Sequence, residues 1–461
     1  MYENLLDKLS QEHVLSHDEY LMLLRHRDEV REYAATLARA ARQTCYGNKI
    51  YIRGLIEFTN YCKNNCLYCG IRGGNTKAQR YRLTPEEIES CAESGYVLGF
   101  RTFVMQGGED PFYTDGMLAN IISEIKRKHP DCAVTLSLGE RSRESYRLLR
   151  EAGADRYLLR HETVDPTHYR SLHPSGMSYE HRIGTYILFQ ETYHKANYEI
   201  LHPTGPKHDY AYHTEAMDRA MEGGIDDVGI GVLFGLDNYQ YEFAGLLMHA
   251  EHLEAVHGVG PHTISVPRVK RADDIDPNAF DNSLSDEMFC KIAACIRIAV
   301  PYTGMIISTR ETPEVREKII RLGVSQISGG SRTSVGGYCE EERPHDTEQF
   351  DVSDNRTLDE VVNWLMRSGY IPSFCTACYR EGRTGDRFMS VCKSGQIQNC
   401  CHPNALMTLK EFLLDYASED TRAIGEAMIE REIGNIPKEK VQQIVRERLV
   451  KIEAGDRDFR F

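Results

Sequence analysis

The sequence predicts an α/β barrel of the TIM type, with nine candidate strands and a mostly helical C-terminal domain. From about Ile52 onward, short apolar runs alternate with amphipathic stretches, beginning with the strand-like segment GLIEFTNY. Alternating βα units of this kind imply a parallel sheet with right-handed crossovers. A sheet that closes into a barrel presents its chemistry on the loops after the strand ends. Functional residues are therefore expected at those positions.

Composition narrows the class of protein. The chain has 461 residues, of which 41% are hydrophobic and 27% charged, as expected for a soluble protein of two or three domains. Its formal charge of −14 argues against a nucleic-acid partner, because phosphate binding needs a concentrated basic patch. The sequence contains no apolar run of about 18 residues and no signal-peptide pattern, so no membrane partner is expected and a cytoplasmic location is the default.

The elements follow in order. Residues 1–50 are expected to form helices, with Ser16 capping one of them. Thr84, Pro85 and Glu87 form a capping box with proline at the first helical position, which predicts a helix after the first strand. The nine strand candidates carry the sequences GLIEFTNY, RTFVMQGGED, AVTLSLGE, DRYLLRHET, IGTYILFQET, DVGIGVLFG, HTISVPR, GMIISTRE and SQISGGSR.

Directly after the first strand the chain reads YCKNNCLYCG, with Cys62, Cys66 and Cys69 in a C-x3-C-x2-C arrangement. Fourteen cysteines in a large chain without a signal peptide favour metal ligation over disulfides. Iron–sulfur clusters normally take four cysteines, so three leave one iron open for a ligand. A closed zinc site is the alternative, and it needs a distant fourth ligand. The scattered cysteines are expected to be small buried side chains; they are Cys45, Cys91, Cys132, Cys290, Cys295 and Cys339.

The cysteine motif resembles that of the radical S-adenosylmethionine (SAM) enzymes, and the run from Ile52 to Arg72 is similar to HydE, a maturase of [FeFe]-hydrogenase. The resemblance implies a [4Fe–4S] cluster whose open iron is chelated by SAM. It also implies SAM-binding roles for the turn Gly107-Gly108-Glu109. A Gly-Gly pair on its own equally indicates a tight turn. Further residues that the resemblance assigns to SAM are Arg160, Glu162 and Arg182.

A tandem repeat follows the fourth strand. Residues 157–176 recur as residues 186–205, at an offset of 29 positions, and Glu162-Thr163 recurs as Glu191-Thr192. Up to about residue 182 the chain resembles HydE, and from about residue 183 it is similar to HydG, the tyrosine-cleaving maturase. We infer a hybrid with a duplicated fourth βα unit; the alternative is an ordinary family member with a chance echo. Because eight strands fill such a barrel, we expect one copy displaced or the barrel split there. Either Glu162 or Glu191 then faces SAM.

A second group of cysteines lies near the C-terminus, where Cys375, Cys378 and Cys401 form C-x2-C-x22-C. This spacing is similar to the HydG auxiliary-cluster motif, which implies a second [4Fe–4S] cluster, or a five-iron form, with a bridging cysteine. The resemblance gives His262 the role of ligand to the extra iron. A zinc knuckle completed by Cys400 or His402 is the alternative. We place the domain boundaries at residues 1–50 (N-terminal helices), 51–340 (barrel) and 341–461 (auxiliary cluster domain).

The resemblance implies an enzyme that cleaves L-tyrosine to p-cresol and dehydroglycine, giving CO and cyanide on iron. Arg310 and Arg332, after the seventh and eighth strands of an eight-stranded barrel, are candidates to hold the substrate carboxylate; surface ion pairing is their alternative role. Expected partners are a reductant such as flavodoxin or ferredoxin and other hydrogenase maturation proteins. The rival functions are a HydE-like activity on a small sulfur or organoiron substrate, and a non-catalytic iron–sulfur-binding hybrid.

Overall fold

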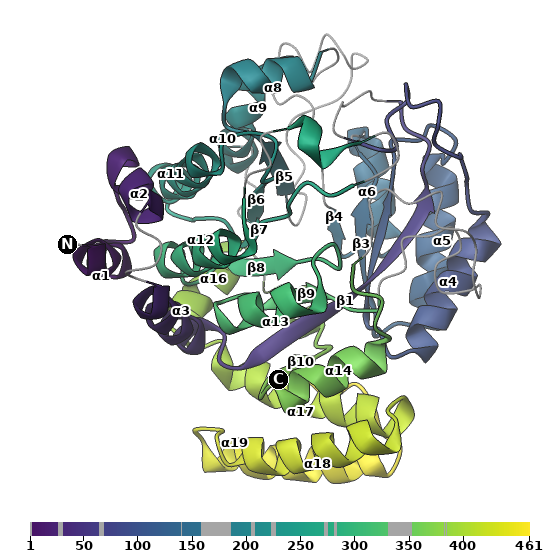
Figure 1. Ribbon diagram of the computed structural model, residues 1–461. Coiled ribbons are helices and arrows are strands. Elements are labelled where there is room, and N and C mark those ends of the chain that lie inside the picture. Colours follow the sequence, from purple (N-terminus) through teal and green to yellow (C-terminus); the bar gives the residue numbers. More distant parts are fainter. Residues whose placement is uncertain are drawn as a thin grey trace.

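The structure is a computed structural model, and it describes residues 2–25, 31–63, 69–139, 141–157, 186–203, 208–222, 227–271, 275–280, 284–330, 353–381, 383 and 385–461. Parallel strands curve into a nearly closed barrel, and helices cover its outside (Figure 1). The strands are β1 (Lys49–Thr59), β2 (Thr102–Gly107), β3 (Ala133–Ser137), β4 (Arg156–Tyr157), β5 (Tyr186–Glu191), β6 (Val228–Val232), β7 (Thr263–Ser265), β8 (Gly304–Ile307), β9 (Gln326–Ser328) and β10 (Ile371–Ser373).

The strand order confirms the nine predicted barrel strands and shows where the sheet opens. The hydrogen-bonded order is β4-β3-β2-β1-β9-β8-β7-β6-β5, so β4 and β5 lie at its two ends. Within the described part of the chain, no ladder joins these two strands. They begin the two copies of the tandem repeat, which agrees with a barrel split at the duplicated unit.

The helices that follow the barrel strands pack on the outer face of the sheet. α4 begins at the predicted capping box, where Thr84 Oγ1 accepts the Glu87 N–H and Glu87 accepts the Thr84 N–H. The barrel helices are α4 (Pro85–Val97), α5 (Asp115–Lys128), α6 (Arg143–Glu151), α8 (Lys195–Leu201), α9 (Tyr210–Thr214), α10 (Ala216–Glu222), α11 (Tyr239–His257), the 3-10 turn η2 (Pro277–Ala279), α12 (Asp286–Ala299) and α13 (Pro313–Arg321).

The first strand is longer than its sequence predicted. β1 starts at Lys49 rather than near Ile52, and its first residues pair with β10 in the register Lys49↔Ile371. Its middle pairs with β9 and its last half with β2. β10 was not among the predicted strands, because a proline such as Pro372 shortly after a helix end usually indicates a loop without regular secondary structure. Proline is tolerated at such an edge position, and the strand ties the C-terminal region to the barrel.

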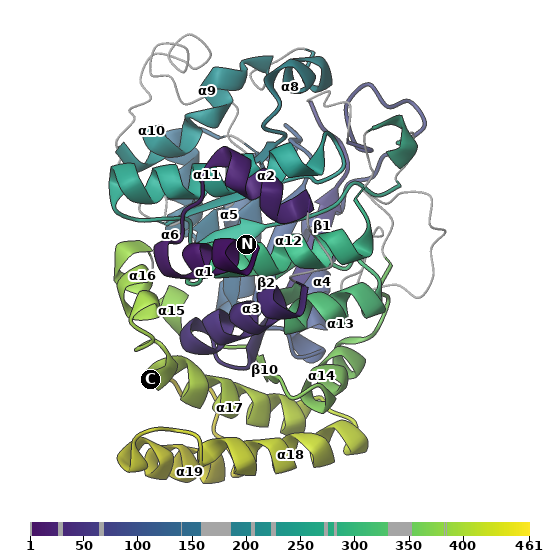
Figure 2. The same cartoon turned by 60° about the vertical axis from the view of Figure 1, so that its left-hand side comes forward.

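Helices at the two ends of the chain complete the fold. The predicted N-terminal helices α1 (Tyr2–Glu12), α2 (His17–Arg25) and α3 (Arg31–Cys45) pack on α11 and α12 (Figure 2). The C-terminal helices are α14 (Leu358–Arg367), α15 (Ala377–Arg380), α16 (Gly385–Lys393), α17 (Gln398–Asp415), α18 (Glu419–Ile433) and α19 (Glu439–Glu453). α17 packs against β10, α18 and α19, so this region shares the barrel's hydrophobic core.

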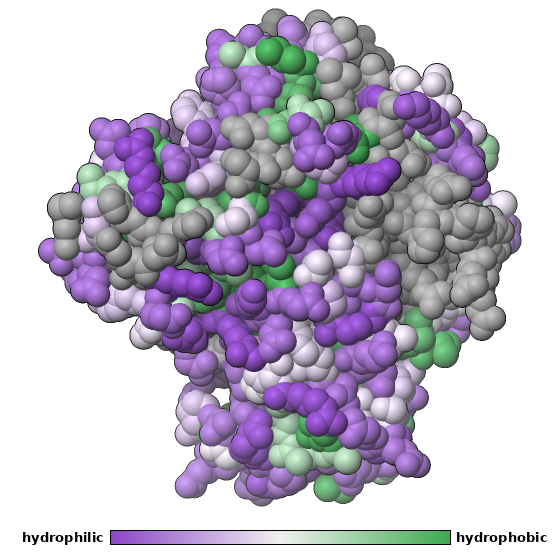
Figure 3. Space-filling view, viewed as in Figure 1, coloured by the Kyte–Doolittle hydropathy of each residue, from purple (hydrophilic) through white to green (hydrophobic). Residues whose placement is uncertain are grey.

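Hydrophilic side chains dominate the face of the molecule seen in Figure 1, with small apolar groups scattered over it (Figure 3). Among the described residues, no helix is both long and apolar enough to cross a membrane. The apolar side chains instead gather inside, where one continuous cluster runs from the N-terminal helices through the barrel to α19.

Candidate functional site

The first cysteine group lies on the loop that leaves the C-terminal end of β1. Cys62 and Cys69 are partly exposed there. Cys66 falls outside the described residues, as do the other predicted ligand-binding residues Arg160, Glu162, Arg182 and Arg332. The loop position agrees with the rule that barrel chemistry sits after strand ends.

Arg80 fastens the two ends of this loop together. Its guanidinium donates to the carbonyl oxygens of Asn60, Ile71, Arg72 and Asn75. Each of these contacts is a charge-assisted hydrogen bond, and their fixed fork geometry restricts the loop backbone. The cysteines are thus presented by a loop whose base is rigid.

The predicted glycine turn after β2 touches the cysteine loop directly. A Cβ added at Gly108 would lie 2.0 Å from the Tyr61 carbonyl oxygen and 2.9 Å from Cys62 Cβ. The backbone of Glu109 accepts the Lys63 N–H at 3.0 Å, and its carboxylate pairs with Lys63 Nζ at 3.0 Å. Only glycine allows this close approach, so the turn and the loop form one cradle, as the SAM-site resemblance requires.

Asp110, next in the chain, anchors the cradle to the barrel. Its carboxylate, 5% exposed, accepts two bonds from Arg82, at 2.6 and 2.9 Å, and one from Thr59 Oγ1 at 2.8 Å. Burial opposes ionisation, but the Arg82 and backbone hydrogen bonds outweigh it and hold the pKa of Asp110 below its usual range. The Arg82 guanidinium also lies 3.9 Å from the centre of the Tyr61 ring. This ion pair therefore braces the residue just before Cys62.

The barrel interior contains a cavity of about 190 Å³. Its walls include Arg53, Arg310 and Glu311. Glu311 is only 2% exposed and pairs with Arg268 and Lys270, which lie outside the lining. Such a lumen suits a small ligand with a carboxylate. Arg310 thus stands where the sequence analysis placed it.

Glu191 ends β5 with a left-handed backbone, at φ 66°. The register against β6 shifts at the same place, between Phe189 and Glu191. A non-glycine residue with positive φ is uncommon and often marks a functional position. Glu191 is 7% exposed, and its rival Glu162 is not described, so the choice between them stays a prediction.

The second cysteine group assembles at the other end of β1. Cys378 and Cys401 are in hydrogen-bond contact, and both interact electrostatically with Cys375. The contact with Cys378 lowers the pKa of the Cys401 thiol, although burial opposes this, whereas burial raises the pKa of the Cys375 thiol. Figure 1 shows β10, which precedes Cys375, and α17, which contains Cys401, at the lower end of β1. The two groups therefore lie at opposite ends of one strand.

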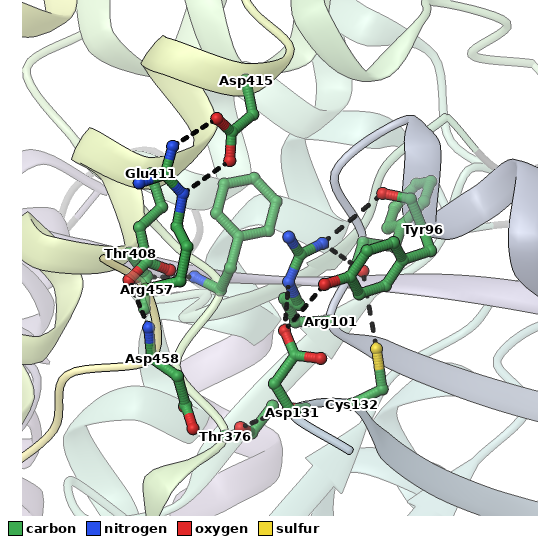
Figure 4. Close-up of polar contacts among 12 residues, drawn as sticks. Tyr96, Arg101, Asp131, Cys132, Thr376, Thr408, Glu411, Asp415, Arg457 and Asp458 are labelled. Atoms are coloured by element: carbon green, nitrogen blue, oxygen red, sulfur yellow. Dashed lines mark hydrogen bonds and ion pairs between the residues drawn. The ribbon is translucent and has the colours of Figure 1, made fainter. Parts of the chain in front are cut away.

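Two contacts attach this cysteine loop to the barrel and to the chain end. Thr376 Oγ1 donates to the Asp131 carbonyl oxygen at 3.1 Å, and Figure 4 shows the pair below Arg101. Asn404, beside Cys401, bonds to Cys375 through its side chain and accepts the Phe461 N–H at 2.9 Å. The loop is thus held from both sides.

The alternative zinc ligands have other partners. Cys400 Sγ accepts from Arg383 at 3.7 Å, and His402 Nε2 bonds to the Glu432 carbonyl oxygen at 3.0 Å. Among the described residues, no group of three or more His, Cys, Asp or Glu side chains is placed to hold a single metal ion. Both candidate fourth ligands of a zinc knuckle are therefore already engaged by other protein groups.

His262 precedes β7, at the same end of the barrel as the second cysteine group. Its Nδ1 lies 2.8 Å from the Asp227 carboxylate, and its ring stacks on Phe388 of α16 at 4.4 Å. A histidine that binds a metal through one ring nitrogen commonly hydrogen-bonds to a carboxylate through the other. The contact with α16 links His262 to the cysteine-bearing region.

Sequence reasoning missed two residues of the second site, Lys49 and Tyr51. Lys49 was assigned to the N-terminal helices, and Tyr51 to the barrel but ahead of its first predicted strand, yet both lie at the start of β1 and interact with Cys401. Burial lowers the pKa of Lys49 to about 8. The available signal was the alternation of Lys49, Tyr51 and Arg53, because a period of two places them on one face of a strand. The Arg80 and Arg82 contacts had no comparable signal.

Comparison with known families agrees with this geometry. Residues 56–247 match the Radical SAM superfamily, and residues 265–371 match the Biotin and Thiamin Synthesis associated domain. Fold and site together place the chain among the radical SAM barrel proteins. That superfamily implies a [4Fe–4S] cluster and SAM, which the Cys62–Cys69 loop and the Gly108 cradle fit.

Individual relatives show which radical SAM proteins this chain is similar to in sequence and structure. The structure of HydG, a maturase of [FeFe]-hydrogenase, is 42% identical, with a TM-score of 0.84, and the match covers 100% of this chain and 95% of that one. HydG from Carboxydothermus hydrogenoformans is 32% identical, with a TM-score of 0.76, over 97% and 93% of the two chains. The HydE subunit of Thermotoga maritima is 49% identical over 147 residues, which is 32% of this chain and 41% of that protein. The chain belongs to the radical SAM maturases of [FeFe]-hydrogenase, as the resemblance predicted.

Proposed function

We propose that this chain is a HydG-like lyase that cleaves L-tyrosine to p-cresol and dehydroglycine, from which carbon monoxide and cyanide arise. The observation that carries the proposal is the second cysteine group, Cys375, Cys378 and Cys401, at the far end of β1 from the first. Two separated cysteine sites suit a reaction in two stages. When bound, the first cluster and SAM supply the radical chemistry.

The chain's own residues hold these groups in place. Cys62, Cys66 and Cys69 ligate the first cluster. The Gly107-Gly108-Glu109 turn receives the amino group of SAM, and Glu162 or Glu191, with Arg160 and Arg182, receives its remaining polar groups. Cys375, Cys378 and Cys401 would ligate the auxiliary cluster, where His262 would bind the additional iron together with a free cysteine. The family resemblance supports these roles, and the contacts described above add support for Gly108, His262 and the second cysteine group.

The substrate binds in the barrel cavity. Arg310, and Arg332 with it, makes a two-pronged contact with the tyrosine carboxylate. The guanidinium groups of Arg53 and Arg310 in the lining suit that anion. A reductant such as flavodoxin or ferredoxin supplies the electron, and other maturation proteins take up the product.

The test is anaerobic reconstitution with iron, sulfide, SAM and L-tyrosine, followed by measurement of p-cresol and 5′-deoxyadenosine. We expect both, and a Cys401→Ser variant that still forms p-cresol but no longer forms carbon monoxide. Arg310→Gln should raise the KM for tyrosine by about tenfold or more, because a charge-assisted pair is lost. 5′-Deoxyadenosine without p-cresol would show that the tyrosine assignment is wrong.

A second candidate is a HydE-like activity on a small sulfur or organoiron substrate. The 49% identity to HydE over 147 residues favours it, because residues of the first three barrel strands, among them Arg53 and Gln106, line part of the cavity. It predicts SAM cleavage that is independent of tyrosine and is stimulated by small thiol-containing compounds. The same assay, run with and without tyrosine, separates the two candidates.

A further inference from the structure

Lys49 is a buried cation beside the second cysteine group. Its side chain is 1% exposed at the start of β1, and its Nζ donates to Gln398 Oε1 at the first residue of α17. No carboxylate among the described residues lies within 4.0 Å of this ammonium. The groups that interact favourably with its charge are Cys401, Glu432 and Cys392, of which Cys401 has the largest effect.

Burying an ammonium without an anionic partner is costly, and proteins rarely keep such a group without one. A cubane held by three thiolates supplies that partner, because the thiolates together outweigh the positive charge of its core. The position of Lys49 is therefore explained if its countercharge is the auxiliary cluster.

Other donors face the cysteines from the same side. The Tyr51 hydroxyl, two residues along β1, donates to the Cys401 sulfur. Arg383 lies near all three cysteines and donates to Cys400 Sγ at 3.7 Å and to the Phe461 carbonyl oxygen at 2.7 Å. Lys49 and Tyr51 belong to a strand in the middle of the sheet, so their positions are rigid. Arg383 has competing partners, and we assign it no role here.

We propose that Lys49 and Tyr51 form a cationic, hydrogen-bonding floor for the cluster ligated by Cys401, and that this floor raises its reduction potential and retains it. The inference rests on the proposed auxiliary cluster. Hydrogen bonds to the sulfurs and nearby charge are recognised determinants of cluster potential. Both residues act through the cluster and its ligand, so they are positioning residues.

The test compares Lys49→Met, Tyr51→Phe and Lys49→Arg with the unmodified protein. Methionine has nearly the same length as lysine, so Lys49→Met should fold, as the thermal midpoint of the cluster-free protein will verify. The matched control is Lys393→Met, which removes the same charge from a half-exposed lysine paired with Glu254. Anaerobic redox titration followed by EPR reports each cluster separately, since SAM perturbs only the first.

For Lys49→Met we expect about a tenfold lower ratio of reduced to oxidised auxiliary cluster at a fixed potential, a shift of about 59 mV to more negative values. Tyr51→Phe should shift it in the same direction by less, and Lys49→Arg should restore it. The SAM-sensitive cluster serves as internal reference and should not move. An auxiliary potential in Lys49→Met equal to that in Lys393→Met would overturn this inference alone. Absence of any SAM-insensitive cluster from the unmodified protein would overturn the proposed function with it.

Discussion

At the scale of single residues, Gly108 brings the turn after β2 against the cysteine loop. The space for any side chain there is taken by the Tyr61 carbonyl and by Cys62. Both groups are backbone or rigid atoms, so neither can yield as a flexible side chain would. The predicted Gly-Gly turn therefore has a specific steric reason.

We predict that Gly108→Ala displaces the loop and impairs the first cluster. Iron content after reconstitution should fall by about half, and the SAM-dependent change in the EPR signal should be lost. Gly116→Ala is the control, because a Cβ at Gly116 in α5 meets nothing within 4 Å. Alanine there should stabilise the helix slightly. Full iron content and a normal SAM response in Gly108→Ala would contradict the cradle.

At the scale of elements, capping residues start helices as the sequence predicted. We expect Thr84→Ala to lower the free energy of unfolding by about 1 kcal/mol, because α4 loses its capping box. Thr36→Ala, on the exposed face of α3, should change stability little. Denaturant unfolding of the cluster-free proteins gives both values. Equal values for the two variants would show that the cap contributes nothing.

The segment after α19 packs back over α17, and one buried carboxyl supports it. Glu411 is 8% exposed and accepts the Asp458 N–H at 2.8 Å, while Arg457 pairs with Asp415 at 2.8 Å beside it (Figure 4). Burial raises the pKa of Glu411 to about 7, above its ordinary 4.5. Protonation is therefore favoured in the folded state.

This shift predicts a pH dependence of stability. Because the folded pKa is the higher one, folding loses stability as pH rises from 4.5 to about 7. Glu411→Gln keeps an acceptor but stays neutral. Its free energy of unfolding relative to the unmodified protein should increase by up to about 3 kcal/mol between pH 5 and pH 8. Thermal unfolding at several pH values measures this, and the exposed Glu447→Gln should show no such trend.

At the scale of the whole molecule, the tandem repeat leaves a seam in the barrel. Tyr157 of β4 pairs with Leu136 of β3, and Tyr186 of β5, 29 positions later, pairs with Val228 of β6. The two tyrosines are equivalent positions of the repeat. A single strand with one copy of the repeat could therefore pair with β3 on one side and with β6 on the other.

We predict that deleting residues 157–185, which joins Arg156 to Tyr186, closes an eight-stranded barrel. The thermal midpoint should rise by a few degrees, because the edges of β4 and β5, which no ladder among the described residues joins, become hydrogen-bonded. Deleting residues 157–186 instead is the control, since a one-residue shift turns each side chain to the other face. A lower midpoint for the in-register deletion than for the control would refute the seam.

The sequence by itself determined the features that depend on local pattern. Residue type and periodicity alone predict the Cys62–Cys69 spacing, the nine strands, the Thr84 cap and the repeat at which the barrel opens. These features are local because helix and strand periodicity and ligand spacing act over a few residues.

Only the tertiary structure decided how these parts meet. β10 is three residues long and contains Pro372, so it exists because β1 offers it partners. Lys49 and Tyr51 belong to the second site because β1 begins before its apolar residues and reaches Cys401. Cys401 lies about 350 residues farther along the chain. No local pattern encodes a contact of that separation, since it arises from the closure of the sheet and the burial that follows.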